Sequence, residues 1–341
     1  MATIGSTFPQ LIDAHRAGGT GDIIEILNQY NPVLDDAIAT QCNMGSVHRH
    51  MIRTGLPGVA WGRLYQGVPQ SKSTVQQVDD TTGFLETMSS IDARLLKLAK
   101  DKAKARLTSA QPFLEAMAQE MATGVFYHNT ATSPEKFKGL APRYGAYGAR
   151  TATDASRQVI NAGGSANANA SIWFVNWSDY ATTLLYPEGT SAGVTHEDKG
   201  EQRVVDGAGN PYFVKESLWT WHTGLAVADW RYNARICNID VEAALAGDVD
   251  LYELMTTAYY RLHSRRRDAK GARIAIYMNG ALLEVLDKLA SATGGSGASA
   301  IRSALRLNPT EIEGKEVLTW RGLPIRECDA LLSNEANVPA A

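Results

Sequence analysis

The feature that most constrains the fold is a run of strand-forming residues with almost no apolar face. Residues 70–78 read Gln-Ser-Lys-Ser-Thr-Val-Gln-Gln-Val. Thr and Val favour extended backbone, but a strand without an apolar face cannot form part of a hydrophobic core. An isolated hairpin is also only marginally stable in water. We therefore expect residues 45–90 to form a long polar hairpin that lies on another molecule.

The turn of this hairpin is expected at Gly-Leu-Pro-Gly, residues 55–58, because Gly and Pro are the strongest turn-forming residues. The chain then returns through residues 59–78. Four residues of the hairpin are the candidate contacts with a neighbouring subunit: Arg53, Trp61, Arg63 and Lys72.

The rest of the chain mixes helical and strand patterns, which predicts an α+β fold. The 341 residues suffice for roughly two domains. Residues 91–127 are expected to be helical, with a break at Gln111 and Pro112, since proline fits the first turn of a helix. The second of these helices carries a core stripe at helical spacing. Its members are Phe113, Met117, Met121 and Val125.

Composition excludes several classes of protein. A formal net charge of -3 and a pI of about 6.2 argue against a dedicated DNA- or membrane-coating protein, because phosphate binding requires excess cations. Three widely spaced cysteines indicate buried thiols rather than a disulfide framework. The first residues do not form a signal peptide, and the charge-free stretch at 162–178 is too polar to span a bilayer.

Two patterns suggest chemistry. Ser191 lies in a Gly-x-Ser-x-Gly match, but Pro187 interrupts the incoming strand and no helical pattern follows, so a chance match is favoured over a hydrolase. His48 and His50 lie near Cys42, yet no fourth ligand has the usual zinc spacing, so solvated histidines are favoured. We predict no catalytic residue, no metal site and no bound cofactor.

A basic cluster lies between residues 261 and 273. Cations at a helix C-terminus complement the helix dipole, which explains some members of the cluster. That role explains Arg265 well, but it explains the consecutive run of Arg265, Arg266 and Arg267 less well. They are candidate contacts with phosphate or with an acidic patch on a neighbour.

Four segments, in order along nearly the whole chain, carry a resemblance to a known family. They are Phe-Tyr-His-Asn at 126–129 with Gly-Leu-Ala-Pro-Arg-Tyr at 139–144, Tyr-Pro-Glu-Gly at 186–189, Gly-Leu-Ala-Val-Ala-Asp-Trp-Arg at 224–231, and Trp-Arg-Gly-Leu-Pro-Ile-Arg at 320–326. Together they resemble the major capsid proteins of short-tailed phages of the epsilon-fifteen type. One departure is His128, where a glycine is expected.

This resemblance implies the Hong Kong 97 capsid fold. The expected parts are an N-terminal arm at 1–44, an extended loop at 45–90, a peripheral domain with a spine helix at 91–247, and an axial domain at 248–341. The segment order is expected to differ from the prototype, with residues 231–239 beside the spine helix and 250–330 in the axial domain. The joint near 244–250 has the small, polar character that such a reordering tolerates.

The resemblance also implies a function and a set of partners. The chain would assemble with itself into hexamers and pentamers of an icosahedral phage head, in the host cytoplasm, and would enclose double-stranded DNA through weak contacts. A portal protein and a cementing protein are further candidate partners. A separate scaffolding protein is expected because the chain begins directly at the arm. No membrane contact is expected. The alternatives are another virion or tail component and, less favoured, a serine hydrolase using Ser191.

Overall fold

The structure is a computed structural model, and it describes residues 29, 31–65, 67–165, 168–264, 272–291, 308–312 and 315–341. Most of the N-terminal arm expected at 1–44, residues 1–28 and 30, lies outside the described part of the chain. The helices are α2 Val33–Asp36, α3 Ala93–Leu98, α4 Lys102–Tyr127, α5 Val241–Ala246, α6 Leu251–Arg261 and α7 Gly280–Ser291. The strands are β1 Ala39–Gln41, β2 Val47–Gly55, β3 Thr74–Asp92, β4 Val159–Asn161, β5 Asn169–Trp177, β6 Thr182–Tyr186, β7 Val194–Val205, β8 Pro211–Val227, β9 Ala234–Asp240, β10 Arg273–Met278, β11 Asn308–Ile312, β12 Lys315–Trp320 and β13 Leu323–Glu327.

A globular body is built around the buried strand β5. Every residue of this strand is buried, as expected for an apolar run such as Ile-Trp-Phe-Val that is covered on both faces. Strand β5 pairs antiparallel with β9 and β10, and β10 pairs parallel with β13. Helices α6 and α7 cover one face, where Met255, Leu282 and Leu286 join the core cluster. The end of α4 covers the other face through Phe126.

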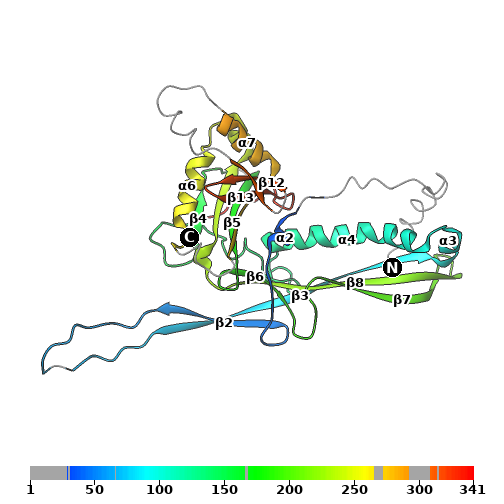
Figure 1. Cartoon of the computed structure of the whole chain (residues 1–341), viewed down its shortest axis with the longest axis horizontal. Helices are drawn as coiled ribbons and strands as arrows, with labels where there is room; N and C mark the ends of the chain where they lie inside the picture. Colours follow the sequence, from blue (N-terminus) through cyan, green and yellow to red (C-terminus); the bar gives the residue numbers. More distant parts are fainter. Residues whose placement is uncertain are drawn as a thin grey trace.

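A long arm, distinct from the N-terminal arm expected at 1–44, extends from the body. It is formed by the ribbon of β3, β8 and β7 with helix α4 lying along it, and is called the arm below (Figure 1). Within β3, residues alternate between the two faces of the ribbon, as the pleat of a strand requires. The α4 side carries Leu85, Thr87 and Ser89, which are at least partly buried. Helix α4 is held there by Arg106, which donates a hydrogen bond of 2.7 Å to Ser217 on β8.

The expected helix break at Pro112 is wrong. Helix α4 is continuous from Lys102 to Tyr127 with Pro112 inside it, and the chain breaks earlier, between α3 and the N-cap residue Asp101. A proline inside a helix removes one backbone hydrogen bond. Pro112 is exposed, so its ring meets solvent. The carboxylate of Asp101 accepts hydrogen bonds from the amides of Ala103 and Lys104, which explains why the helix begins there.

The strand at 234–240 does not pair with the arm strands. Strand β9 pairs with β4 and β5, in the same sheet as β10. The boundary expected at residue 247 therefore passes through one hydrogen-bonded sheet, with β5 and β9 before it and β10 and β13 after it. The C-terminal segment also ends in the body, where Glu335 forms a β-bridge with Asn169 of β5 and Ala340 forms one with Tyr147.

No helix within the described ranges is long and apolar enough to cross a membrane.

Candidate functional site: the assembly surfaces

The expected hairpin is present and projects from the body as a two-stranded ribbon (Figure 1). The tight turn expected at 55–58 is wrong, because an open loop connects Gly55 at the end of β2 to Thr74 at the start of β3. Strand β2 pairs only with the first half of β3, up to the pair Val47 and Thr81. From Thr82 onward β3 pairs with β8 instead. One continuous strand thus connects the projecting hairpin to the arm.

The tip of the hairpin is apolar, which differs from the polar surface that we expected. The side chain of Trp61 is 99% exposed, so it has almost no contact with its own chain. The other large exposed apolar residues of the loop are Leu56, Val59, Leu64, Tyr65 and Val68. So many large apolar side chains exposed in one loop make the loop a candidate interaction site.

The base of the hairpin is fixed to the body by a buried ion pair. Asp80 of β3 is 4% exposed and accepts a hydrogen bond of 2.7 Å from Arg143. Arg143 also donates to the carbonyl oxygen of Leu225 on β8. On the neighbouring strand, Arg49 forms two hydrogen bonds of 2.8 Å with Asp79. These contacts set the direction in which the hairpin leaves the body.

All four predicted contact residues of the hairpin are exposed. Arg53 lies near the end of β2, opposite Val75 of β3, whereas Trp61, Arg63 and Lys72 lie in the open loop between the strands. Their contact with a neighbouring subunit stays a prediction, because one chain is described.

The face of the arm ribbon opposite α4 is a second exposed surface. It carries Phe84, Glu86 and Met88 of β3, all of which are exposed. Phe84 stacks against His222 of β8, with ring centroids 5.8 Å apart. Glu197 of β7, the partner of Leu218 on β8, adds a second carboxylate close to this surface. Glu197 forms an ion pair of 2.6 Å with Lys199, so the surface is mainly apolar, with Glu86 as its other carboxylate.

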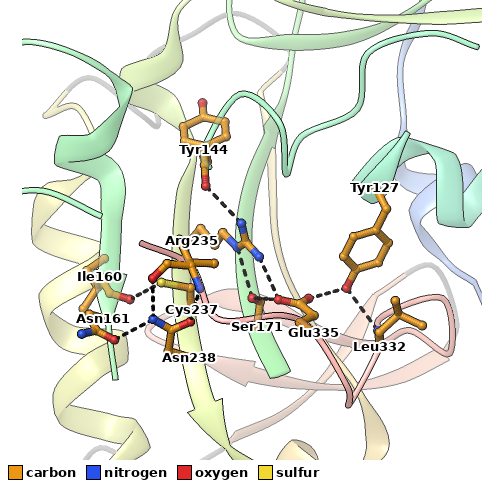
Figure 2. A network of polar contacts seen from close by, with 11 residues as sticks. Tyr127, Tyr144, Ile160, Asn161, Ser171, Arg235, Cys237, Asn238, Leu332 and Glu335 are labelled. Atoms are coloured by element: carbon orange, nitrogen blue, oxygen red, sulfur yellow. Dashed lines mark hydrogen bonds and ion pairs between the residues drawn. The ribbon is translucent and has the colours of Figure 1, made fainter. Parts of the chain in front are cut away.

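A buried polar cluster that sequence reasoning missed connects the C-terminal segment to the body (Figure 2). Arg235 of β9 and Glu335 are both 5% exposed at the side chain and form an ion pair of 2.8 Å. Glu335 also accepts hydrogen bonds from Ser171 of β5 and from Tyr127, the last residue of α4. Burial and the neighbouring carboxylate of Glu335 raise the pKa of Tyr127 far above its ordinary value, so its hydroxyl remains a donor.

The N-terminal segment is fastened to the same end of the body. Asp36, which ends α2, accepts hydrogen bonds from Tyr277 of β10 and Arg326 of β13. Asn31 accepts a bond of 2.9 Å from the amide of Ala330. These contacts hold the segment from residue 31 across the ends of β10 and β13, close to where α4 meets the body (Figure 1).

Ser191 lies in an exposed turn between β6 and β7. The preceding Gly189 and the following Gly193 have positive φ, which is typical of turns and not of a strand-to-helix elbow. The nearest histidine in sequence, His196, stacks on Trp219 with ring centroids 4.2 Å apart. The structure therefore does not place Ser191 in the context that a serine hydrolase requires.

The histidines of the hairpin are half-buried rather than solvated as we expected. His50 lies 3.9 Å from Asp80, and burial lowers its pKa. Cys42 is buried, and burial raises the pKa of its thiol. Among the described residues no group of three or more His, Cys, Asp or Glu side chains is arranged to hold a metal ion.

The predicted phosphate contacts Arg265, Arg266 and Arg267 lie outside the described residues. The first member of that basic cluster, Arg261, has a structural role. Its guanidinium donates hydrogen bonds to the carbonyl oxygens of Gly148, Arg157 and Val159. Burial lowers its pKa.

His128, the departure from the family pattern, caps the end of α4. Its ring lies against Gly124, where a Cβ atom would be 2.5 Å from the imidazole. The ring contacts Phe137 edge-on and its Nε2 lies 3.1 Å from Glu120. A histidine is thus accommodated because residue 124 is glycine.

An extended two-stranded loop, a long helix along a sheet and a mixed sheet body are the parts expected of a capsid protein. The family model for "Major capsid protein GP7" matches residues 15–339. A solved structure of bacteriophage Epsilon15 is 30% identical over all of both chains, with a TM-score of 0.71. The chain therefore belongs to the GP7 family of major capsid proteins, from phages similar to epsilon15, and has the Hong Kong 97-type capsid fold.

The capsid of a native GTA particle is a more distant likeness. It is 10% identical, with a TM-score of 0.45 over 66% of this chain and 98% of that chain. No curated protein matches the chain.

Proposed function

We infer that this chain builds the shell of a phage head by assembling as hexamers and pentamers around double-stranded DNA. The observation that carries the inference is the projecting hairpin with its exposed apolar tip, in a chain of the major capsid protein family. Leaving Trp61 and its neighbours in water is unfavourable for a monomer. Covering each large apolar side chain contributes about 1.5–3 kcal/mol before the costs of association.

The surface that receives the hairpin is the exposed face of the arm ribbon on a second copy. Residues 53–73 contain three cations, Arg53, Arg63 and Lys72, and no acidic residue. The ribbon face offers Phe84, Met88 and the carboxylate of Glu86. Apolar side chains meet apolar side chains, and opposite charges on the rims select the register.

The division of the chain into N-terminal arm, extended loop, peripheral domain and axial domain is proposed as a division of assembly roles. The peripheral part holds α4 and the ribbon, and the axial part holds β10, β13 and α7 near the capsomer centre. Proposed partners are a scaffolding protein during assembly in the host cytoplasm, a portal protein, a cementing protein and, by weak contact, the packaged DNA.

The decisive experiment replaces the loop between Gly55 and Thr74 with Asn-Gly. These two residues are paired at the end of the β2 and β3 ladder, and a two-residue turn suits such a pair. The variant should remain folded by circular dichroism, because the loop contributes nothing to either core. It should form no shells by negative-stain microscopy. Normal shells from this variant would contradict the proposal.

A point variant tests the role of the apolar tip alone. Trp61→Ala should slow or abolish shell formation while leaving the unfolding midpoint of the free subunit unchanged. The matched control is Tyr180→Ala, because Tyr180 is also an exposed aromatic residue but lies outside the hairpin. Equal assembly of both variants would remove Trp61 from the contact.

Ser191 has no catalytic role in the proposed shell protein. Ser191→Ala should assemble and infect as the parent does, because its turn lacks the geometry of a nucleophile elbow. A covalent adduct of Ser191 with a serine-directed phosphonate probe would contradict this.

A further inference from the structure

The far end of the arm concentrates positive charge. Six of the 33 lysines and arginines of the chain fall within residues 94–106, with Asp101 as the single acidic residue among them. They lie on α3, in its connection to α4 and on the first turns of α4, at the end of the arm opposite the projecting hairpin (Figure 1). This concentration is unusual for a chain with a net charge of -3.

Three of these cations are not neutralised within the described chain. Arg94 pairs with Asp92 at 2.9 Å, and Arg106 pairs with Asp198 at the same distance. The carboxylate of Asp101 is engaged by the amides at the start of α4. The ion pairs seen in the described residues include none for the exposed Lys97, Lys100 and Lys102, which we call the basic end.

Lys97, Lys100 and Lys102 lie within six residues of one another, around the start of α4. The carboxylate of Asp101 caps the first amides of this helix and offsets the partial positive charge of its N-terminus. The three lysine charges have no such counter-charge among the ion pairs of the described residues. The basic end therefore has a positive potential that favours an anion.

We propose that the basic end binds the phosphate backbone of double-stranded DNA without sequence preference. The proposal rests on the proposed function, because it needs a shell that encloses DNA. Lysine ammonium groups are flexible point charges, which suits phosphates along a duplex. Bidentate carboxylate recognition would favour arginine, and both arginines of this segment are already paired.

An acidic protein segment is the competing partner. Such a segment would use apolar anchors as well as charge, and Leu98 and Leu107 are exposed nearby. Single exposed apolar residues are common on protein surfaces, however, and do not make an anchor pocket. Three unpaired lysines together favour a phosphate backbone.

The test compares two triple variants of the full chain as unassembled subunits. One variant carries Lys97→Gln, Lys100→Gln and Lys102→Gln. The matched control carries Lys138→Gln, Arg150→Gln and Lys288→Gln, which removes the same charge from exposed positions elsewhere. The probe is a fluorescent 30-base-pair duplex of random sequence, and anisotropy is measured over a series of salt concentrations.

The basic-end variant should bind the duplex at least about tenfold more weakly at low salt, since its phosphate contacts are lost. The slope of log K against log salt should fall by about 0.9 for each contact removed, or about 2.7 for three. The control should keep its affinity and slope. In DNA-filled heads, formaldehyde should cross-link DNA to the peptide that contains residues 97–102.

Three results would overturn the proposal: unchanged binding by the basic-end variant, an equal loss in the control, or no cross-link at 97–102. Competition by polyglutamate as strong as competition by duplex DNA, at equal charge, would assign the surface to an acidic protein instead. Shell formation by each variant is scored separately by microscopy. Normal shells with unchanged DNA binding would reject only this inference and leave the proposed function intact.

Discussion

Removing one charge from the buried pair of Arg235 and Glu335 should destabilise the subunit strongly. Glu335→Gln keeps the size of the side chain but leaves the guanidinium of Arg235 without a counter-charge at a site where both are 5% exposed. Breaking a buried pair in this way costs about 3–5 kcal/mol. The loss is not recovered from water, because the site is closed to solvent.

The expected shift in the unfolding midpoint follows from the lost free energy and the unfolding entropy of a chain of this length. With an unfolding entropy of about 2.1 cal/mol/K per residue, 341 residues give about 0.7 kcal/mol/K. The unfolding midpoint of Glu335→Gln should therefore fall by about 4–7 °C. The measurement is thermal unfolding of unassembled subunits by circular dichroism, with Glu188→Gln as the control at an exposed glutamate.

A double variant separates the charge pair from other effects. Arg235→Gln with Glu335→Gln leaves two neutral amides, so it should be less destabilised than the sum of the two single variants. A midpoint for Glu335→Gln within about 1 °C of the parent would refute the reasoning, because a loss of 3–5 kcal/mol would then be absent. Additive single variants would show that the two side chains act independently.

Three further predictions follow from burial and close packing. Burial raises the pKa of the Cys237 thiol to about 11 and that of Cys328 to about 12, so iodoacetamide at pH 8 should label both only after denaturation. Burial lowers the pKa of His128 below its ordinary value, so the unfolded chain binds a proton at a higher pH than the folded chain does. The free energy of unfolding should therefore fall as the pH is lowered from 7 to 5, and it should fall less steeply in His128→Asn. Gly83→Ala would place a Cβ atom 2.9 Å from the carbonyl oxygen of Glu135 and should lower the free energy of unfolding by about 1–3 kcal/mol, measured in urea.

Local patterns in the sequence predicted the elements that depend on neighbouring residues. The polar run at 70–78 predicted the projecting hairpin, because the lack of an apolar face is visible in any single strand. The stripe at helical spacing likewise predicted the buried face of α4, where Met117, Met121 and Val125 lie. Spacing and turn residues were enough for these segments, since both are visible in a short stretch of the chain.

Long-range pairing was not predictable from such patterns. Nothing near Glu335 in sequence indicates that it will meet Arg235, which lies 100 residues earlier. The expectation of a helix break at Pro112 failed for a related reason. Tertiary packing of α4 along the ribbon outweighs the hydrogen bond that the proline removes. The basic end was missed because its charge was read as part of an ordinary helix.

The continuity of β3 connects stability to assembly. Its first half, to Thr81, pairs only with β2, and its second half, from Thr82, pairs with β8 beside α4. The direction of the hairpin is therefore set where the pairing changes, and that point lies next to the buried contact of Arg143 with Asp80. A change there would redirect the loop without altering Trp61 or any other residue at its tip. Shell geometry can thus depend on a buried ion pair that touches no neighbouring subunit.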